Sequence, residues 1–148
     1  MGALNREEAV KDLLAGIAYL KREPGVDGTR IGVTGYCMGG SYALLLPCRT
    51  KEIRAAAPYY GEVPDETTLK HLACPVLYIY GDADFWITRE DVRRLEEALK
   101  KFGKPGEVKI YPGAPHAFFN DTRDVYRQAE ARDAWARTLA FFARHLKA

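Results

Sequence analysis

The sequence predicts an α/β protein: a mainly parallel sheet of about four strands with helices on both faces. The first observation is alternation, since short apolar runs suited to strands are separated by stretches with helical spacing. The second is that every connection between strands is long enough to hold a helix, as parallel neighbours require. The third is the continuous apolar run Pro75-Val-Leu-Tyr-Ile-Tyr80, which is typical of a strand covered on both faces.

Length and composition narrow the class of protein. At 148 residues, 47% of them apolar, the chain is predicted to form a single domain over residues 1–148. The formal charge is +2, and acids and bases are interspersed without the basic stripe that favours nucleic acid. We expect a protein that is neither secreted nor membrane-spanning, because neither a leader nor an apolar run of about eighteen residues is found.

The cysteine content also favours a protein that is not secreted. The three cysteines form an odd set without metal-ligand or redox spacing: Cys37, Cys48 and Cys74. We therefore expect a reducing cytoplasm, no metal and no cofactor.

The first half of the chain reads as helix, strand, helix and strand. An apolar stripe predicts a helix over residues 5–22, with Asn5 and Glu8 placed like a capping box. The turn Asp27-Gly28 leads into a strand over residues 30–34. The next helix runs from Cys37 to about Leu46, where Pro47 stops it. Residues 53–60 form the second strand, and the polar segment to Leu72 holds a single irregular helix.

The second half adds two strands and two longer helices. After the strand over residues 75–80, Thr88 and Asp91 are placed to cap a helix that residues 103–106 break. A fourth strand is predicted over residues 107–111, a loop over 112–121 and a long helix over 122–146. The predicted core stripe of that helix is Trp135, Leu139, Phe142 and Leu146.

Residues 35–39 carry the pattern Gly-x-Cys-x-Gly at a strand-to-helix turn. This is the nucleophile elbow of α/β-hydrolases with Cys37 in place of serine. Such a nucleophile sits in a strained backbone, and side chains at Gly35 and Gly39 are expected to collide with their neighbours. The start of the helix favours the reactive thiolate, and the Met38 N–H is the expected oxyanion donor. The alternative is an ordinary buried cysteine in a glycine-rich turn.

Cys37, Asp84 and His116 each follow the end of a different predicted strand. Ligands of open parallel sheets bind beyond the carboxyl ends of the strands. A thiol nucleophile needs a base, and the base needs an acid to fix its tautomer. The order along the chain, nucleophile then acid then base, is that of the α/β-hydrolases.

Several residues compete for these roles. Asp82, Glu62 and Asp65 are the alternatives to Asp84, although Asp82 also suits holding the turn. His71 and His145 are expected to be structural. Aromatic side chains flank the three residues and either line an apolar substrate pocket or belong to the core; they are Tyr36, Tyr60, Phe85, Trp86, Phe118 and Phe119.

Four ordered motifs resemble the dienelactone hydrolases (carboxymethylenebutenolidases) over essentially the whole chain. They are Gly35-Tyr-Cys37-Met-Gly39-Gly40, Tyr59-Tyr60-Gly61, Gly81-Asp-Ala-Asp84 and Tyr111-Pro-Gly-Ala-Pro-His116-Ala-Phe118. The resemblance implies that Cys37, Asp84 and His116 form a catalytic triad. It also implies a cytoplasmic enzyme that acts on enol lactones and small activated esters without a cofactor.

The chain differs from the dienelactone hydrolases in one respect. Members of that family have a further N-terminal portion with the first strands, a carboxylate that interacts with the cysteine, and a loop that donates one oxyanion N–H. The expected fold is therefore a truncated α/β-hydrolase fold, the C-terminal portion of the family's domain. Its edge at residues 30–34 invites a partner, so we expect a homodimer or higher oligomer.

The sequence thus predicts a cysteine-dependent hydrolase of small activated esters or lactones. The alternative is a weak or inactive truncated homologue that acts as an interaction module or as a fragment of a larger enzyme. A redox-sensing thiol protein is less favoured, because no resolving cysteine lies near Cys37 in the sequence.

Overall fold

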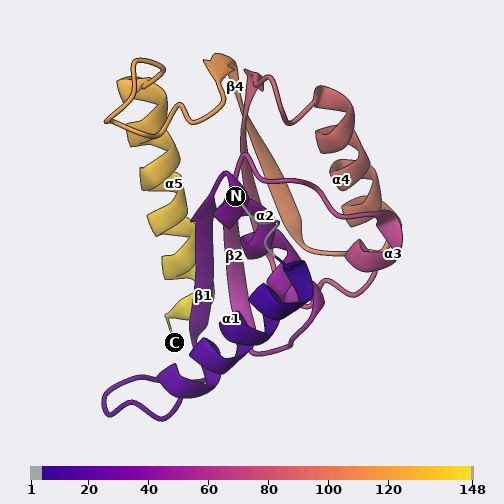
Figure 1. Ribbon diagram of the computed structural model, residues 1–148, viewed down its shortest axis with the longest axis vertical. Coiled ribbons are helices and arrows are strands. Elements are labelled where there is room, and N and C mark those ends of the chain that lie inside the picture. Colours follow the sequence, from indigo (N-terminus) through magenta and orange to yellow (C-terminus); the bar gives the residue numbers. More distant parts are fainter. Residues whose placement is uncertain (1–4, 148) are drawn as a thin grey trace.

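The computed structural model describes residues 5–147, and its sheet has four strands in the order β1-β2-β3-β4 (Figure 1). The strands are β1 (Ile31–Tyr36), β2 (Ile53–Tyr59), β3 (Val76–Ala83) and β4 (Gly106–Pro115). Each neighbouring pair is parallel. The predicted fold class is confirmed. Among the described strands β1 pairs with β2 alone, so its other edge is open.

Helices cover both faces of this sheet. They are α1 (Arg6–Leu20), α2 (Met38–Leu45), α3 (Glu66–Leu69), α4 (Arg89–Lys101) and α5 (Gln128–Leu146), with a short 3₁₀ helix η1 (Leu46–Cys48) after α2. One buried cluster joins the sheet to α1, α2, α3 and α4, and a second joins it to α5. In Figure 1, α5 accordingly stands on one side of the strands and α3 and α4 on the other. None of the helices within residues 5–147 is long and apolar enough to cross a membrane.

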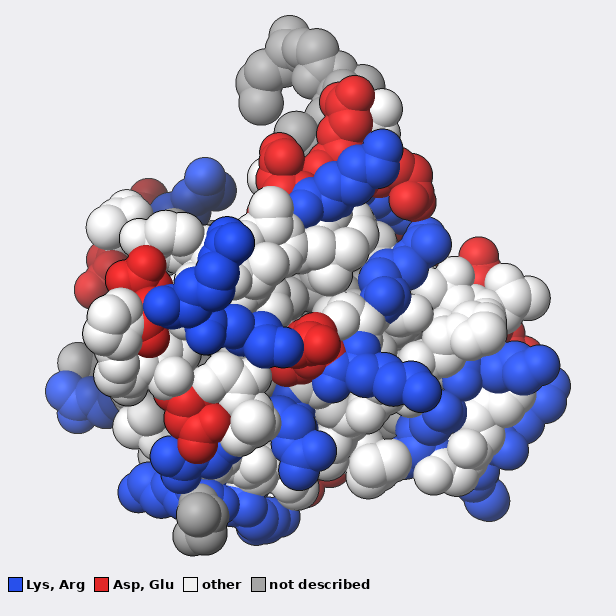
Figure 2. All heavy atoms as spheres, turned by 90° about the horizontal axis from the view of Figure 1, so that it is seen from below, with Lys and Arg blue, Asp and Glu red and all other residues white. Residues whose placement is uncertain are grey.

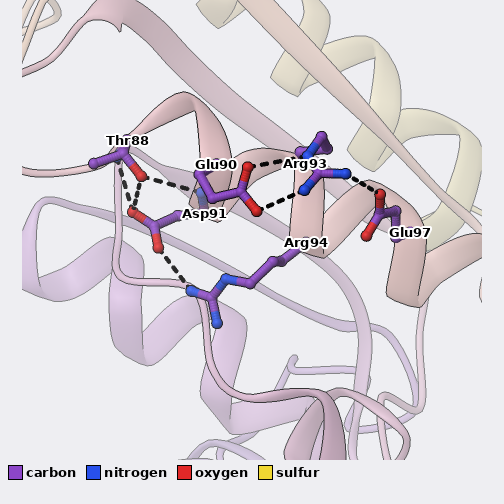
Figure 3. A network of polar contacts seen from close by, with 6 residues as sticks. All are labelled: Thr88, Glu90, Asp91, Arg93, Arg94 and Glu97. Carbon is purple, nitrogen blue, oxygen red and sulfur yellow. Dashed lines mark hydrogen bonds and ion pairs between the residues drawn. The ribbon is translucent and has the colours of Figure 1, made fainter.

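The start of α4 is fixed by the predicted cap. Thr88 Oγ1 accepts a hydrogen bond from the Asp91 N–H at 3.1 Å, and the Asp91 carboxylate accepts one from the Thr88 N–H at 2.9 Å. Figure 3 shows this capping box together with ion pairs from Arg94 to Asp91 and from Arg93 to Glu90 and Glu97. A cap of this kind contributes about 1 kcal/mol to stability. It also holds the end of the loop that carries Asp84.

The last helix differs from its prediction at both its start and its buried face. It begins at Gln128 rather than Thr122, because turns follow the fourth strand as far as Arg127, whose N–H bonds to the Phe118 carbonyl at 2.9 Å. Half of the predicted stripe is confirmed, since Phe142 and Leu146 are partly buried and pack against the core. The other half is wrong, since Trp135 is 42% and Leu139 51% exposed. Small residues are buried instead, together with Phe141; they are Ala131, Ala134 and Thr138.

A buried hydrogen bond explains this choice of face. The Tyr59 hydroxyl of β2 lies 2.7 Å from Thr138 Oγ1 and donates to the Ala134 carbonyl at 3.1 Å. Small side chains on α5 allow this approach, whereas Trp135 would not. Periodicity shows that a helix has an apolar stripe, but a neighbouring strand decides which face is buried.

The third and fourth strands run further than predicted. β3 extends to Ala83 and β4 to Pro115, and these two residues are partners in the ladder. Asp84 is the first residue after β3, and His116 is the first residue after β4. The extra pairing therefore brings the predicted acid and base out of the sheet side by side.

Charges are mixed on the end of the molecule where the strands begin. Figure 2 views this end and shows Lys and Arg side chains spread over it with acidic groups among them. Lys21, just after α1, pairs with Glu52 in the loop that leads into β2, and Arg30 pairs with Asp27 at 2.6 Å within the loop that leads into β1.

Close backbone packing holds the β1–α2 turn. A Cβ atom at Gly35 would lie 2.1 Å from the Gly39 carbonyl oxygen, and one at Gly40 would lie 2.2 Å from the Tyr59 carbonyl oxygen. The predicted collision at Gly35 is therefore confirmed. The prediction for Gly39 is wrong, because a Cβ there meets nothing within 4 Å. The second indispensable glycine is Gly40, which packs against the end of β2.

This contrast predicts opposite effects of two adjacent substitutions. Gly40→Ala forces the α2 backbone away from β2 and should lower the free energy of unfolding by about 1–3 kcal/mol or more. Gly39→Ala should be neutral or raise it by about 0.5–1 kcal/mol, because alanine suits a helix better than glycine does. Urea denaturation measures both. Equal destabilisation by the two changes would contradict this packing.

Candidate active site

Cys37 occupies a strained position between β1 and α2. Its backbone has φ 56° and ψ −120°, a combination that side-chain-bearing residues rarely adopt. The Cys37 N–H donates to the Tyr59 carbonyl at 3.1 Å, and the Cys37 carbonyl accepts from the Ser41 N–H at 3.1 Å. The Ser41 hydroxyl also accepts from the Glu62 N–H at 2.8 Å. These bonds fix the turn, and the thiol is left half-buried at its tip.

His116 lies between Cys37 and Asp84. Its Nε2 is 3.1 Å from Cys37 Sγ, and its Nδ1 is 2.7 Å from Asp84 Oδ2. The Asp84 side chain is fully buried, and its Oδ1 accepts hydrogen bonds from the Trp86 and Ile87 N–H groups at 2.7 and 2.9 Å. A carboxylate at Nδ1 favours the tautomer that carries its proton there, so Nε2 can accept a proton from the thiol. The arrangement suits base-assisted attack by sulfur.

The loop that carries His116 is tied to the end of β3. Asp82 Oδ1 accepts a hydrogen bond from the Gly113 N–H at 2.6 Å. A Cβ at Gly81 would lie 2.2 Å from the Ala114 carbonyl oxygen, so the two strands approach closely here. Asp82 thus holds the turn, as the sequence suggested, and Asp84 is the carboxylate that reaches the imidazole.

The other candidates have different partners. Glu62 pairs with Arg6 at 2.5 Å, and Asp65 caps α3 by accepting from the Thr68 N–H at 2.8 Å. His71 is exposed at the end of α3. The His145 ring packs on Phe141 at 4.7 Å between centroids.

A cavity of about 460 Å³ opens beside the thiol. Of the predicted pocket residues, Tyr36, Tyr60 and Phe119 line it together with Cys37 and His116. The Tyr60 side chain is 2% exposed, and burial raises the pKa of its phenol, which keeps the hydroxyl protonated. Within the described chain this hydroxyl makes no hydrogen bond, so it can donate one to a molecule in the cavity.

Three other predicted pocket residues lie elsewhere. Phe118 is wrong as a lining residue: it is fully buried against Tyr60 and Tyr111, and belongs to the core. Phe85 is 87% exposed, and the centroid of its ring lies 5.3 Å from that of the His116 ring. The Trp86 ring is 5.5 Å from the imidazole and lines a second, smaller hollow.

The sequence reasoning missed most of the far wall of the cavity, of which it predicted only Phe119. This wall comes from the segment that follows His116; its residues are Ala117, Phe119, Asn120, Asp121 and Arg123. The other wall residues are not aromatic, and only aromatic side chains were predicted to line a pocket. Asn120 and Asp121 lie in the same predicted loop as His116, and that shared loop was the usable signal.

The Met38 amide is the nearest backbone donor to the thiol in the sequence. Met38 is the first residue of α2, where an N–H has no partner within the helix, and this N–H donates to no acceptor in residues 5–147. It is therefore free to bind a negative oxygen. Over the same residues, we find no group of three His, Cys, Asp or Glu side chains that could hold a metal ion.

The chain is similar to known proteins over nearly its whole length. A family model described as "Dienelactone hydrolase family" matches residues 1–146. A Bradyrhizobium protein named "Probable 2-oxo-3-(5-oxofuran-2-ylidene)propanoate lactonase" is 34% identical over 97% of this chain. A carboxymethylenebutenolidase-like protein of Salmonella typhimurium is 36% identical over 82% of it.

A solved structure agrees with these relatives. The crystal structure of a dienelactone hydrolase-like protein from Klebsiella pneumoniae superposes with a TM-score of 0.88 at 30% identity, over 94% of this chain. The chain spans only part of each relative: 62% of the Bradyrhizobium and Klebsiella proteins and 48% of the Salmonella protein. From the match to the family model and these identities, the chain belongs to the dienelactone hydrolase family.

Proposed function

We propose that this chain hydrolyses small activated esters or lactones with Cys37 as nucleophile, His116 as base and Asp84 as its orienting acid. The observation that carries the proposal is the contact of one imidazole with both partners, 3.1 Å to the sulfur and 2.7 Å to the carboxylate. The family, and relatives whose names include lactonase and carboxymethylenebutenolidase, support the substrate class. No cofactor is required by this chemistry.

The proposed reaction has two halves. His116 Nε2 takes the thiol proton while Sγ forms a bond to the carbonyl carbon. The C–O bond to the leaving group then breaks, and the leaving oxygen receives the proton from His116. In the second half, His116 deprotonates a water that attacks the thioester carbonyl carbon. The C–S bond then breaks, the acid is released, and Sγ takes back the proton from His116. Asp84 stabilises the imidazolium in both halves.

The negative oxygen of each tetrahedral intermediate needs hydrogen-bond donors. We assign the Met38 N–H to this role, because it is unpartnered at the start of α2. A single donor supports turnover only of substrates with a low intrinsic barrier.

The alternative is that these residues belong to a longer protein and act only within it. It is favoured by one observation, that the chain spans between 48% and 62% of the relatives above. Under either proposal residues 1–148 form one structural unit. The three free cysteines suit a reducing compartment such as the cytoplasm.

We predict turnover of nitrophenyl acetate and negligible turnover of ethyl acetate by the isolated chain. Nitrophenolate leaves with little protonation, whereas the absence of one oxyanion donor costs about 10²–10³ in rate for any substrate. The measurement is kcat/KM for both esters, with Cys37→Ala as the inactive variant and Cys48→Ala as the matched cysteine control. Hydrolysis of nitrophenyl acetate that survives Cys37→Ala would refute the nucleophile, and efficient Cys37-dependent hydrolysis of ethyl acetate would refute the oxyanion argument.

We also predict selective alkylation of Cys37. Burial raises the pKa of Cys48 to about 11 and that of Cys74 to about 12. Both therefore remain thiols near neutral pH, and their labelling should rise about tenfold per pH unit until the pH approaches those values. Cys37 is accessible and contacts a base, so limiting iodoacetamide should modify it first.

Peptide mass spectrometry reads this labelling site by site. The His116→Ala variant serves as control, and it should slow the alkylation of Cys37 while leaving that of Cys48 unchanged. Equal labelling of all three cysteines in the folded chain would contradict the proposed reactivity.

Finally, we propose that a second copy of this chain covers the open edge of β1 and the exposed stripe of α5. That edge presents unpaired backbone groups, and Trp135 and Leu139 expose apolar surface beside it. Light scattering at micromolar concentration should give a dimer, which Leu139→Glu dissociates. Tyr19→Glu, a change at a 58% exposed position of α1, is the control and should leave the dimer intact. A monomeric unsubstituted chain would refute the assembly.

A further inference from the structure

A second hollow of about 240 Å³ lies beside the nucleophile turn and shares no lining residue with the cavity that holds Cys37 and His116. One wall is a face of α2. Met38, Tyr42 and Leu45 are spaced by four and three residues, which places them in line along that helix. The hollow therefore begins at the residue that carries the proposed oxyanion donor and runs along α2 away from it.

The rest of the lining includes both apolar and polar residues. The Ser41 hydroxyl is satisfied, because it accepts a hydrogen bond from the Glu62 N–H at 2.8 Å. Trp86 and Pro64 come from the loops after β3 and β2. The charged residues Arg6 and Glu62 pair with each other at 2.5 Å, and their side chains are 56% and 48% exposed. The two charges neutralise each other, so an uncharged apolar group fits the space better than an ion does.

When sulfur attacks, each substituent of the substrate carbonyl needs its own space, either in the cavity beside His116 or in the hollow along α2. Once Sγ has added, the oxygen lies toward the Met38 N–H, and the leaving group lies toward His116, which must protonate it. The third substituent is the carbon chain of the acid. The hollow beside Met38 is a space open to this carbon chain, and the Trp86 ring that lines the hollow has its centroid 5.5 Å from that of the His116 ring.

We propose that this hollow is the acyl-chain subsite and that it selects unbranched aliphatic esters of medium chain length. The inference rests on the proposed function, because it takes Cys37 as nucleophile. A group the size of a water or a methylene occupies about 30 Å³, so a hollow of about 240 Å³ holds about eight such groups when perfectly filled. Imperfect packing reduces this to a chain of about six carbons.

The first experiment is a series of nitrophenyl esters from acetate to decanoate. We expect kcat/KM to rise about two- to fourfold per added methylene up to hexanoate and then to level off or fall. Tyr42→Ala should remove at least about threefold of the preference for hexanoate over acetate, because it deletes one wall. Tyr42→Phe retains the ring and should retain the preference. Tyr19→Ala, on an exposed face of α1, controls for the loss of a surface tyrosine.

A second readout does not depend on turnover. Alkyl trifluoromethyl ketones add reversibly to a thiol: the Sγ–C bond forms, the carbonyl π bond breaks, and the oxygen takes up the thiol proton. The hexyl ketone should protect Cys37 from iodoacetamide at a concentration at least about tenfold below that of the methyl ketone. Tyr42→Ala should reduce that ratio. Mass spectrometry of the Cys37 peptide measures the protection.

The outcomes separate the two proposals. If no ester is hydrolysed but the hexyl ketone protects Cys37 preferentially, the proposed function fails and the subsite stands. If esters are hydrolysed without dependence on chain length, the subsite is refuted and the function stands. A chain-length preference that Phe119→Ala abolishes and Tyr42→Ala does not would place the acyl chain in the larger cavity and also overturn the inference.

Discussion

The close contact between the start of α2 and the end of β2 is the constraint on which the site depends. Backbone atoms of Gly40 and Gly61 approach so closely that a Cβ on Gly61 would lie 2.1 Å from the Gly40 carbonyl carbon. The buried Tyr78 hydroxyl holds the same point from β3 by donating to the Gly61 carbonyl at 2.5 Å. This contact fixes the start of α2 against the end of β2, and the residue immediately before α2 is thereby held at positive φ. That residue is Cys37.

A second constraint comes from the pairing of β3 with β4, at the edge of the sheet opposite β1. The pairing of β3 with β4 continues to Ala83 and Pro115, and the next residues along the two strands are the carboxylate and the imidazole. The buried carboxylate accepts three hydrogen bonds, one from the imidazole and two from the backbone that follows it. Its position is thus set before any substrate binds, which is what a group that orients a base requires.

The sequence was informative where the signal is local. The elbow pattern, the Thr88 cap and the buried run of the third strand each lie within a few residues, and each was placed correctly to within the ends of the element. The meeting of Cys37 and Asp84 at His116 could be predicted, because the carboxyl ends of parallel strands lie at one edge of the sheet.

The failures all involve contacts between distant segments. Which face of α5 is buried depends on the Tyr59 hydroxyl of β2, and which glycine of the turn is indispensable depends on the end of that same strand. Phe118 was assigned to the pocket because it is two residues from His116, yet it points into the core. In each case periodicity or proximity in sequence left two choices, and packing across the sheet selected one.

The proposed reaction depends on sulfur as the atom that forms a bond to the substrate. The most direct measurement is acid quenching of the chain within milliseconds of mixing with nitrophenyl butanoate, followed by peptide mass spectrometry. We predict a butanoyl thioester on the peptide that contains Cys37, formed as nitrophenolate is released and lost as water hydrolyses it. Release of nitrophenolate with no acyl group on that cysteine would contradict the account.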